Sequence, residues 1–98
     1  MWRDMKSIFD KKPVTPGTIL LTRYLIPNNI TQKQLAAHLG WTSTRLNEII
    51  KNKRGITADS AISLSEAFGT SSEYWMDLQR DIDLYRTAKV HVRIIRLI

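Results

Sequence analysis

Short apolar segments at helical spacing, most of them followed by a glycine or a proline, limit this 98-residue chain to a set of short packed helices. Side chains three and four residues apart lie on one face of a helix, so each segment has one side to bury. Hydroxyl residues precede several segments, where a side-chain oxygen can accept from the free N–H groups of a helix start. The pattern predicts five helices, which begin near residues 16, 31, 42, 57 and 71; the fifth runs to about residue 86.

The residues expected to form the core recur at this spacing within the five helices. They are Ile19, Leu20, Tyr24, Leu25, Leu35, Ala36, Leu39, Leu46, Ile49, Ile50, Ala61, Ile62, Leu64, Ser65, Phe68, Trp75, Leu78, Ile82 and Tyr85. Gly40 and Gly69 stand where a left-handed C-cap ends the second and the fourth helix.

The tail after the fifth helix has a different pattern. Its apolar residues are mostly β-branched and recur with a period near two, which favours a strand over a frayed tail or a last helical turn. No other segment predicts a strand, and a lone strand has unpaired backbone edges. We therefore expect residues 89–98 to pair with the same strand of a second copy in a homodimer. The expected organisation is an extension at 1–12, a helical domain at 13–88 and this strand at 89–98.

Composition narrows the classes of function. Lysine and arginine number 15 against 9 acidic residues, a net charge of +6, which favours an anionic partner, although many small basic proteins bind nothing acidic. There is no cysteine, which excludes disulfides and thiolate chemistry. His38 and His91 are far apart, so no metal site is expected, and no nucleophile–base pattern or glycine-rich phosphate loop is present. We expect a cytoplasmic protein that is not an enzyme and has neither a cofactor nor a membrane partner.

The second and third helices, over residues 31–51, have the pattern of a helix-turn-helix. Ala36 is small enough for a close helix crossing, Gly40 permits the sharp turn, and apolar residues lock the two helices together. Such a rigid pair presents the start of its second helix to the DNA major groove.

Several polar residues are then placed to contact DNA. Asn47 has the amide geometry for a bidentate contact to adenine, Thr44 can contact a thymine methyl group, and Arg45 can reach a guanine or a phosphate. The helix start favours phosphate, as do the cations that follow the helix. The predicted DNA-binding residues are Gln32, Thr42, Ser43, Thr44, Arg45, Asn47, Lys51, Lys53 and Arg54.

Glu48 faces the same side as these residues, where DNA phosphates repel a carboxylate. It can accept from a cytosine amino group, or it can be held by Arg45 or Lys51 at a spacing of three. Both alternatives are open from the sequence.

Three stretches give the chain a family resemblance. PVTPGTIL at residues 13–20, NKRGITADSAI at 52–62 and GTSSEYWMDLQ at 69–79 resemble the HigA antitoxins of bacterial toxin–antitoxin pairs, within the XRE-type domains. The resemblance covers about residues 13–88. It implies an all-α fold with a five-helix, lambda-repressor-like DNA-binding domain, to which the pattern of the tail adds a C-terminal β-strand for dimerisation.

The resemblance also implies two roles. The protein would neutralise a HigB-type toxin, a messenger RNA endonuclease of the RelE type, and would repress its own operon as a dimer. The alternatives are an XRE-type regulator without a toxin, and a protein-binding adaptor on the same fold. The polar start of the third helix and the cations after it favour binding to double-stranded DNA.

Overall fold

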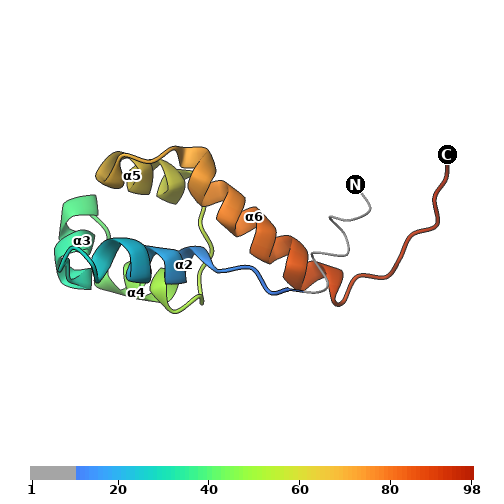
Figure 1. Ribbon diagram of the computed structural model, residues 1–98, viewed down its shortest axis with the longest axis horizontal. Coiled ribbons are helices and arrows are strands. Elements are labelled where there is room, and N and C mark those ends of the chain that lie inside the picture. The colour runs from blue at the N-terminus through green and yellow to red at the C-terminus, as the bar shows by residue number, and fades with distance from the viewer. Residues whose placement is uncertain (1–10) are drawn as a thin grey trace.

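The computed structural model describes residues 11–98, and all the regular structure in that range is helical (Figure 1). The elements are α2 (Pro16–Ile19), η1 (Leu20–Leu25), α3 (Gln32–Leu39), α4 (Ser43–Ile50), α5 (Ala58–Phe68) and α6 (Ser72–Ala88). Because η1 is a π-helical run that continues α2, these elements are the five expected helices. The extension expected over residues 1–12 lies outside the described range except for Lys11 and Lys12.

The predicted helix ends are confirmed. The Thr31 hydroxyl accepts from the Gln34 amide at 3.0 Å, and the Gln34 side chain accepts in return from the Thr31 amide at 2.9 Å. Thr42, Thr57 and Ser71 cap the following helices through a hydroxyl that accepts from a backbone amide three residues on, without the return bond. Gly40 and Gly69 end α3 and α5 with φ of 72° and 68°.

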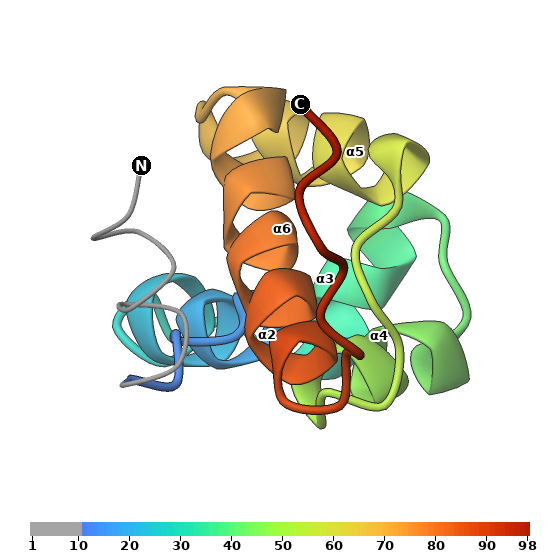
Figure 2. The ribbon, with the colours of Figure 1, turned by 90° about the vertical axis from the view of Figure 1, so that its right-hand side faces the viewer.

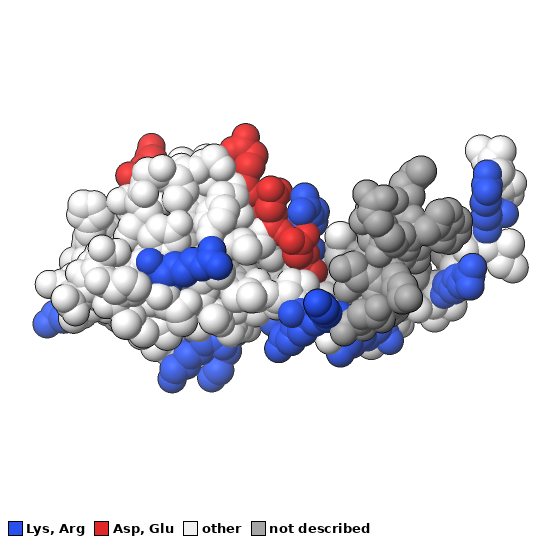
Figure 3. Space-filling model, viewed as in Figure 1, with Lys and Arg blue, Asp and Glu red and all other residues white. Residues whose placement is uncertain are grey.

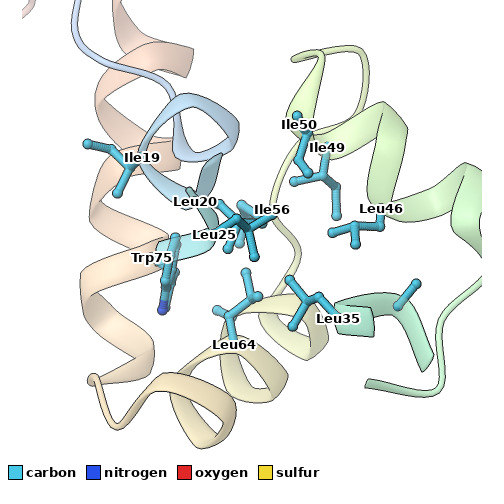
Figure 4. Close-up of a cluster of buried hydrophobic side chains, with 12 residues drawn as sticks. Ile19, Leu20, Leu25, Leu35, Leu46, Ile49, Ile50, Ile56, Leu64 and Trp75 are labelled. Carbon is cyan, nitrogen blue, oxygen red and sulfur yellow. The ribbon is translucent and has the colours of Figure 1, made fainter. Parts of the chain in front are cut away.

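The core lies where all the helices meet. Leu20 and Leu25 lie at its centre, between Trp75 from α6, Leu64 from α5 and the apolar side of α4 (Figure 4). The Trp75 indole N–H donates to the Thr70 hydroxyl at 2.7 Å, which satisfies the polar atom of a fully buried ring.

The prediction that Ile62 belongs to the core is wrong. Ile62 is 50% exposed, because the buried stripe of α5 follows Ala61 and Leu64, and Ile62 lies one residue further around the helix.

The aromatic residues of η1, α5 and α6 form a partly buried cluster around Tyr24. The ring centroid of Tyr24 lies 4.9 Å from that of Phe68 and 5.5 Å from that of Trp75. Burial, and then the neighbouring Tyr74 hydroxyl, raises the pKa of the Tyr24 phenol. The phenol thus stays neutral and serves packing.

The expected C-terminal strand is wrong. Helix α6 continues to Ala88, and residues 89–98 then extend from the body with no strand pairing (Figures 1 and 2). The apolar side chains of this tail are exposed, from Ile94 at 75% to Ile98 at 97%. The expected strand needed the same segment of a second copy as its partner, and strand preference alone does not order a tail that has no strand beside it.

Gly17 of α2 packs directly against the backbone of α4. A Cβ atom on Gly17 would lie 2.0 Å from the carbonyl oxygen of Ile49, which belongs to the last turn of α4. No side chain fits there, so α2 packs on α4 through bare backbone.

We therefore expect Gly17→Ala to lower the free energy of unfolding by about 1–3 kcal/mol, because backbone must move to admit the methyl group. Urea denaturation followed by circular dichroism measures it. Thr22→Ala, on the exposed side of η1, is the control and should stay within about 0.5 kcal/mol of the wild type. Equal stability of the two variants would contradict the close contact.

Candidate functional site

Helices α3 and α4 form the predicted helix-turn-helix, joined by the turn at Gly40. The Trp41 amide donates to the Ala36 carbonyl at 2.9 Å, and Ala36 itself is 2% exposed at the helix crossing. Leu35 and Leu46 are buried between the two helices and the rest of the core. The pair is therefore held as one rigid unit.

The start of α4 is polar and open. The Thr42 hydroxyl accepts from the Arg45 amide at 3.1 Å, so this hydroxyl is used as the N-cap. Ser43 and Thr44 follow and are exposed. Short side chains at a helix start leave room for a ligand to approach the backbone N–H groups.

An amide pair links the two helices on this outward side. The Asn47 side-chain N–H₂ group donates to the Gln32 side-chain oxygen at 3.1 Å. This bond fixes which end of the Asn47 amide points to Gln32. It leaves the Asn47 oxygen and its second N–H without a protein partner among the described hydrogen bonds.

Arg45 turns away from this amide pair toward α5. Its guanidinium donates to the Asp59 carboxylate at 3.2 Å and to the Ser60 hydroxyl at 2.9 Å, and it lies 4.0 Å from the centre of a Trp41 ring. These contacts come from the turn, α4 and α5 together. Arg45 therefore links the turn, α4 and α5 within the protein, a role that sequence spacing alone did not indicate.

Glu48 has a partner that the sequence analysis did not consider. Its carboxylate accepts from Arg54 at 2.7 and 3.0 Å, six residues along the chain. The backbone causes this: Asn52 has φ of 61°, and the Lys53 amide donates back to the Glu48 carbonyl at 2.8 Å. The negative charge of Glu48, which would repel DNA phosphates, is thus neutralised by the adjacent Arg54 guanidinium.

The loop between α4 and α5 carries the other predicted cations and is anchored on α6. The Gln79 side-chain oxygen accepts from the Ile56 amide at 2.7 Å, and a Cβ atom on Gly55 would lie 3.1 Å from the Gln79 nitrogen. Lys51 and Lys53 are exposed on either side of Asn52. Gln79 was not among the predicted site residues, although it lies within the stretch that carried the resemblance.

Charge is divided between two sides of the molecule (Figure 3). Basic side chains gather along the lower edge, below α4 and toward the C-terminal end of α6, and acidic side chains gather above, over α5 and α6. Within residues 11–98, every acidic side chain except that of Glu48 lies in α5 or α6. The helix-turn-helix side is thus the side suited to a polyanion.

The described part of the chain has neither a cluster of metal-ligating residues nor a membrane-spanning helix. No group of three or more histidine, cysteine or acidic residues there comes together as a metal site. None of the helices in residues 11–98 is long and apolar enough to cross a membrane.

Comparison with known proteins gives consistent matches. The helix-turn-helix family model matches residues 21–75. Virulence-associated protein I of Dichelobacter nodosus is 39% identical over 72% of the chain, and the chain covers 66% of that protein. Antitoxin HigA-1 of Vibrio cholerae is 35% identical over 79% of the chain and 72% of its own length. The structure of Pseudomonas aeruginosa antitoxin HigA with the higBA promoter superposes with a TM-score of 0.80, at 33% identity over 88% of this chain and 99% of that one.

The contacts of Arg45 lead to a prediction about stability. A lysine ammonium cannot form two directed hydrogen bonds and lie flat on Trp41 at once, so Arg45→Lys should lower the free energy of unfolding by about 1 kcal/mol. Urea denaturation measures it, with Arg23→Lys on the exposed side of η1 as the control. A wild-type midpoint for Arg45→Lys would show that the cluster contributes nothing to folding.

Proposed function

Because the chain belongs to the helix-turn-helix family that includes the HigA antitoxins, we propose that it is an antitoxin that binds double-stranded operator DNA as a homodimeric repressor of its own operon. The observation that carries this proposal is the open polar side of α4, with the Gln32–Asn47 amide pair at its centre and exposed lysines after its end. It acts in the cytoplasm, where operator DNA lies.

Base recognition falls to Asn47. Adenine offers an acceptor, N7, and a donor, the N6 amino group, in the major groove, and an amide can bond both. Gln32 takes one N–H of the Asn47 amide, and this leaves one donor and one acceptor for the base. Gln32 thereby orients the amide that recognises DNA, and its own amide nitrogen can reach a phosphate.

Phosphate contacts set the affinity and the register. Ser43 and Thr44 stand at the positive end of the α4 dipole, and Lys51 and Lys53 follow its other end. Because Arg54 forms an ion pair with Glu48, these two residues together add little net attraction for DNA. Arg45 supports the turn from inside rather than contacting a base.

Neutralisation of a HigB-type toxin, a messenger RNA endonuclease, is the second half of the proposal. Its support is the likeness to antitoxins, among them HigA-1 of Vibrio cholerae and an addiction module antidote protein of the HigA family from Coxiella burnetii. A regulator without a toxin would share the DNA-binding surface and lack this partner.

The DNA half is tested by Asn47→Ala. It should weaken binding to the promoter fragment of the protein's own operon by about 1–3 kcal/mol and leave binding to a mixed-sequence duplex unchanged. Fluorescence anisotropy on both duplexes measures this. Asn28→Ala is the control, since that exposed amide bonds only the Tyr24 carbonyl. Equal losses on both duplexes would make Asn47 a phosphate contact, and no binding by the wild type at low salt would end the DNA proposal.

The toxin half is tested by co-expression with the small protein encoded next to this gene. We expect that protein to arrest growth alone, and growth to return with this chain present. Co-purification of the two proteins measures the complex. A neighbour that arrests growth whether or not this chain is made would contradict neutralisation.

A further inference from the structure

We infer that a groove between the α4–α5 loop and the C-terminal half of α6 is an additional phosphate site for DNA, held by Lys53 and Arg86. This inference rests on the proposed DNA-binding function and extends it beyond the helix-turn-helix. It adds Arg86 of α6 to the interface, a residue that is not among the DNA-binding residues predicted from the sequence.

The groove has fixed walls. It measures about 410 Å³ and lies between the start of α2, the loop from Asn52 to Thr57, and α6. The contact of Gly17 with Ile49 closes one end, and the bond from the Ile56 amide to Gln79 holds the loop against α6. Ile56 and Ile82, both buried, underlie it. A ligand would therefore meet a shaped surface.

The charges in this groove favour an anion. Three cations line it, Lys53, Arg54 and Arg86, against one carboxylate, Asp83. Arg54 is paired with Glu48, and Asp83 accepts from the Gln79 side chain at 2.8 Å. Lys53 and Arg86 form no ion pair with another residue of the described range, and both are exposed.

The hydroxyl groups in the groove are already used. The Thr15 hydroxyl donates to Thr18 at 2.8 Å, and the Thr57 hydroxyl donates to Ser60 at 3.1 Å. The cations and the Asn52 amide are thus what the side chains of the groove have left to offer a ligand. A groove that offers mainly unpaired cations favours an anion such as phosphate, which forms charge-assisted hydrogen bonds with them.

The position of the groove points to the DNA backbone as the source of that phosphate. The loop that carries Lys53 follows directly from α4, and Arg86 lies in the last turn of α6. Basic side chains line the lower edge of the molecule from α4 toward the C-terminal end of α6 (Figure 3). A duplex that takes α4 in its major groove must carry its backbone past the end of that helix. The groove is therefore continuous with the proposed interface.

The variant Arg86→Gln tests the site, with Arg80→Gln as the matched control. Arg80 is on the same helix but pairs with Asp77 and Asp81 on the acidic side. The probe is a labelled mixed-sequence duplex, whose binding is followed by anisotropy over a series of salt concentrations. Each lost phosphate contact should make the slope of log K against log salt shallower by about one and weaken binding about 3- to 10-fold. We expect this for Arg86→Gln and for Lys53→Gln, and wild-type behaviour for Arg80→Gln.

A second pair of variants tests for the opposite change in DNA affinity. Asp83→Asn keeps an oxygen that accepts from Gln79 and removes the one negative charge of the groove, so it should tighten binding. Asp77→Asn, on the acidic side, should not. Circular dichroism checks that each variant is folded.

The possible results distinguish a failure of the groove proposal from a failure of the proposed DNA-binding function. A wild-type slope for Arg86→Gln beside a shallower slope for Lys53→Gln would overturn the groove and leave DNA binding intact. Equal losses for Arg86→Gln and Arg80→Gln would reduce the effect to net charge and also overturn it. No salt-dependent binding by the wild type would remove the proposed function itself.

Discussion

The contact between Gly17 and the last turn of α4 governs the geometry of the whole DNA-binding side. A carbonyl oxygen, that of Ile49, occupies the place where any other residue would put its Cβ atom. Two helices that touch through backbone have little freedom to slide, because no flexible side chain lies between them. The end of α4 is thereby fixed to the body, and with it the direction in which the helix presents Ser43 and Thr44.

The three stretches that resemble the HigA family meet around one loop. Gly17 belongs to the first, Gly55 and Ile56 to the second, and Gln79 to the third, and these residues hold the loop against α2 and α6. The residues that carry the resemblance therefore hold in place the loop that bears the cations. Asn47, which bonds the base in the proposed mechanism, lies outside all three stretches. A family match of this kind supports the presentation of a DNA-binding surface and does not specify the sequence that the surface recognises.

The helices and most of the core were predictable because their causes are local. Caps such as Thr31 and Gly40 act within a few residues, and a buried stripe has a fixed period. Ile62 and the C-terminal tail were mispredicted because burial and strand pairing depend on what the rest of the chain brings near. The π-helical form of η1 was not predicted, and no residue within this segment indicates it.

The partners of the charged residues were unpredictable for a related reason. Helical spacing offers Glu48 only Arg45 and Lys51 as partners, whereas the chain reverses at Asn52 and brings Arg54 to the Glu48 carboxylate. Arg45 meets Asp59 and Ser60 only because α5 crosses beside the turn. Side-chain spacing gives the face of a helix, but the partner on that face comes from tertiary packing.

These pairs change how the net charge of +6 should be understood. Arg54 is offset by Glu48 and Arg45 by Asp59, so two of the predicted DNA-binding cations are already balanced within the protein. Opposite charges held close together cancel at distances beyond the pair, and salt screens what remains. In the proposed mechanism the unbalanced attraction comes from Lys51, Lys53, Arg86 and the start of α4, while Asn47 supplies the choice of base. Affinity and sequence choice are therefore assigned to different residues on one rigid surface, so a change in one can leave the other intact.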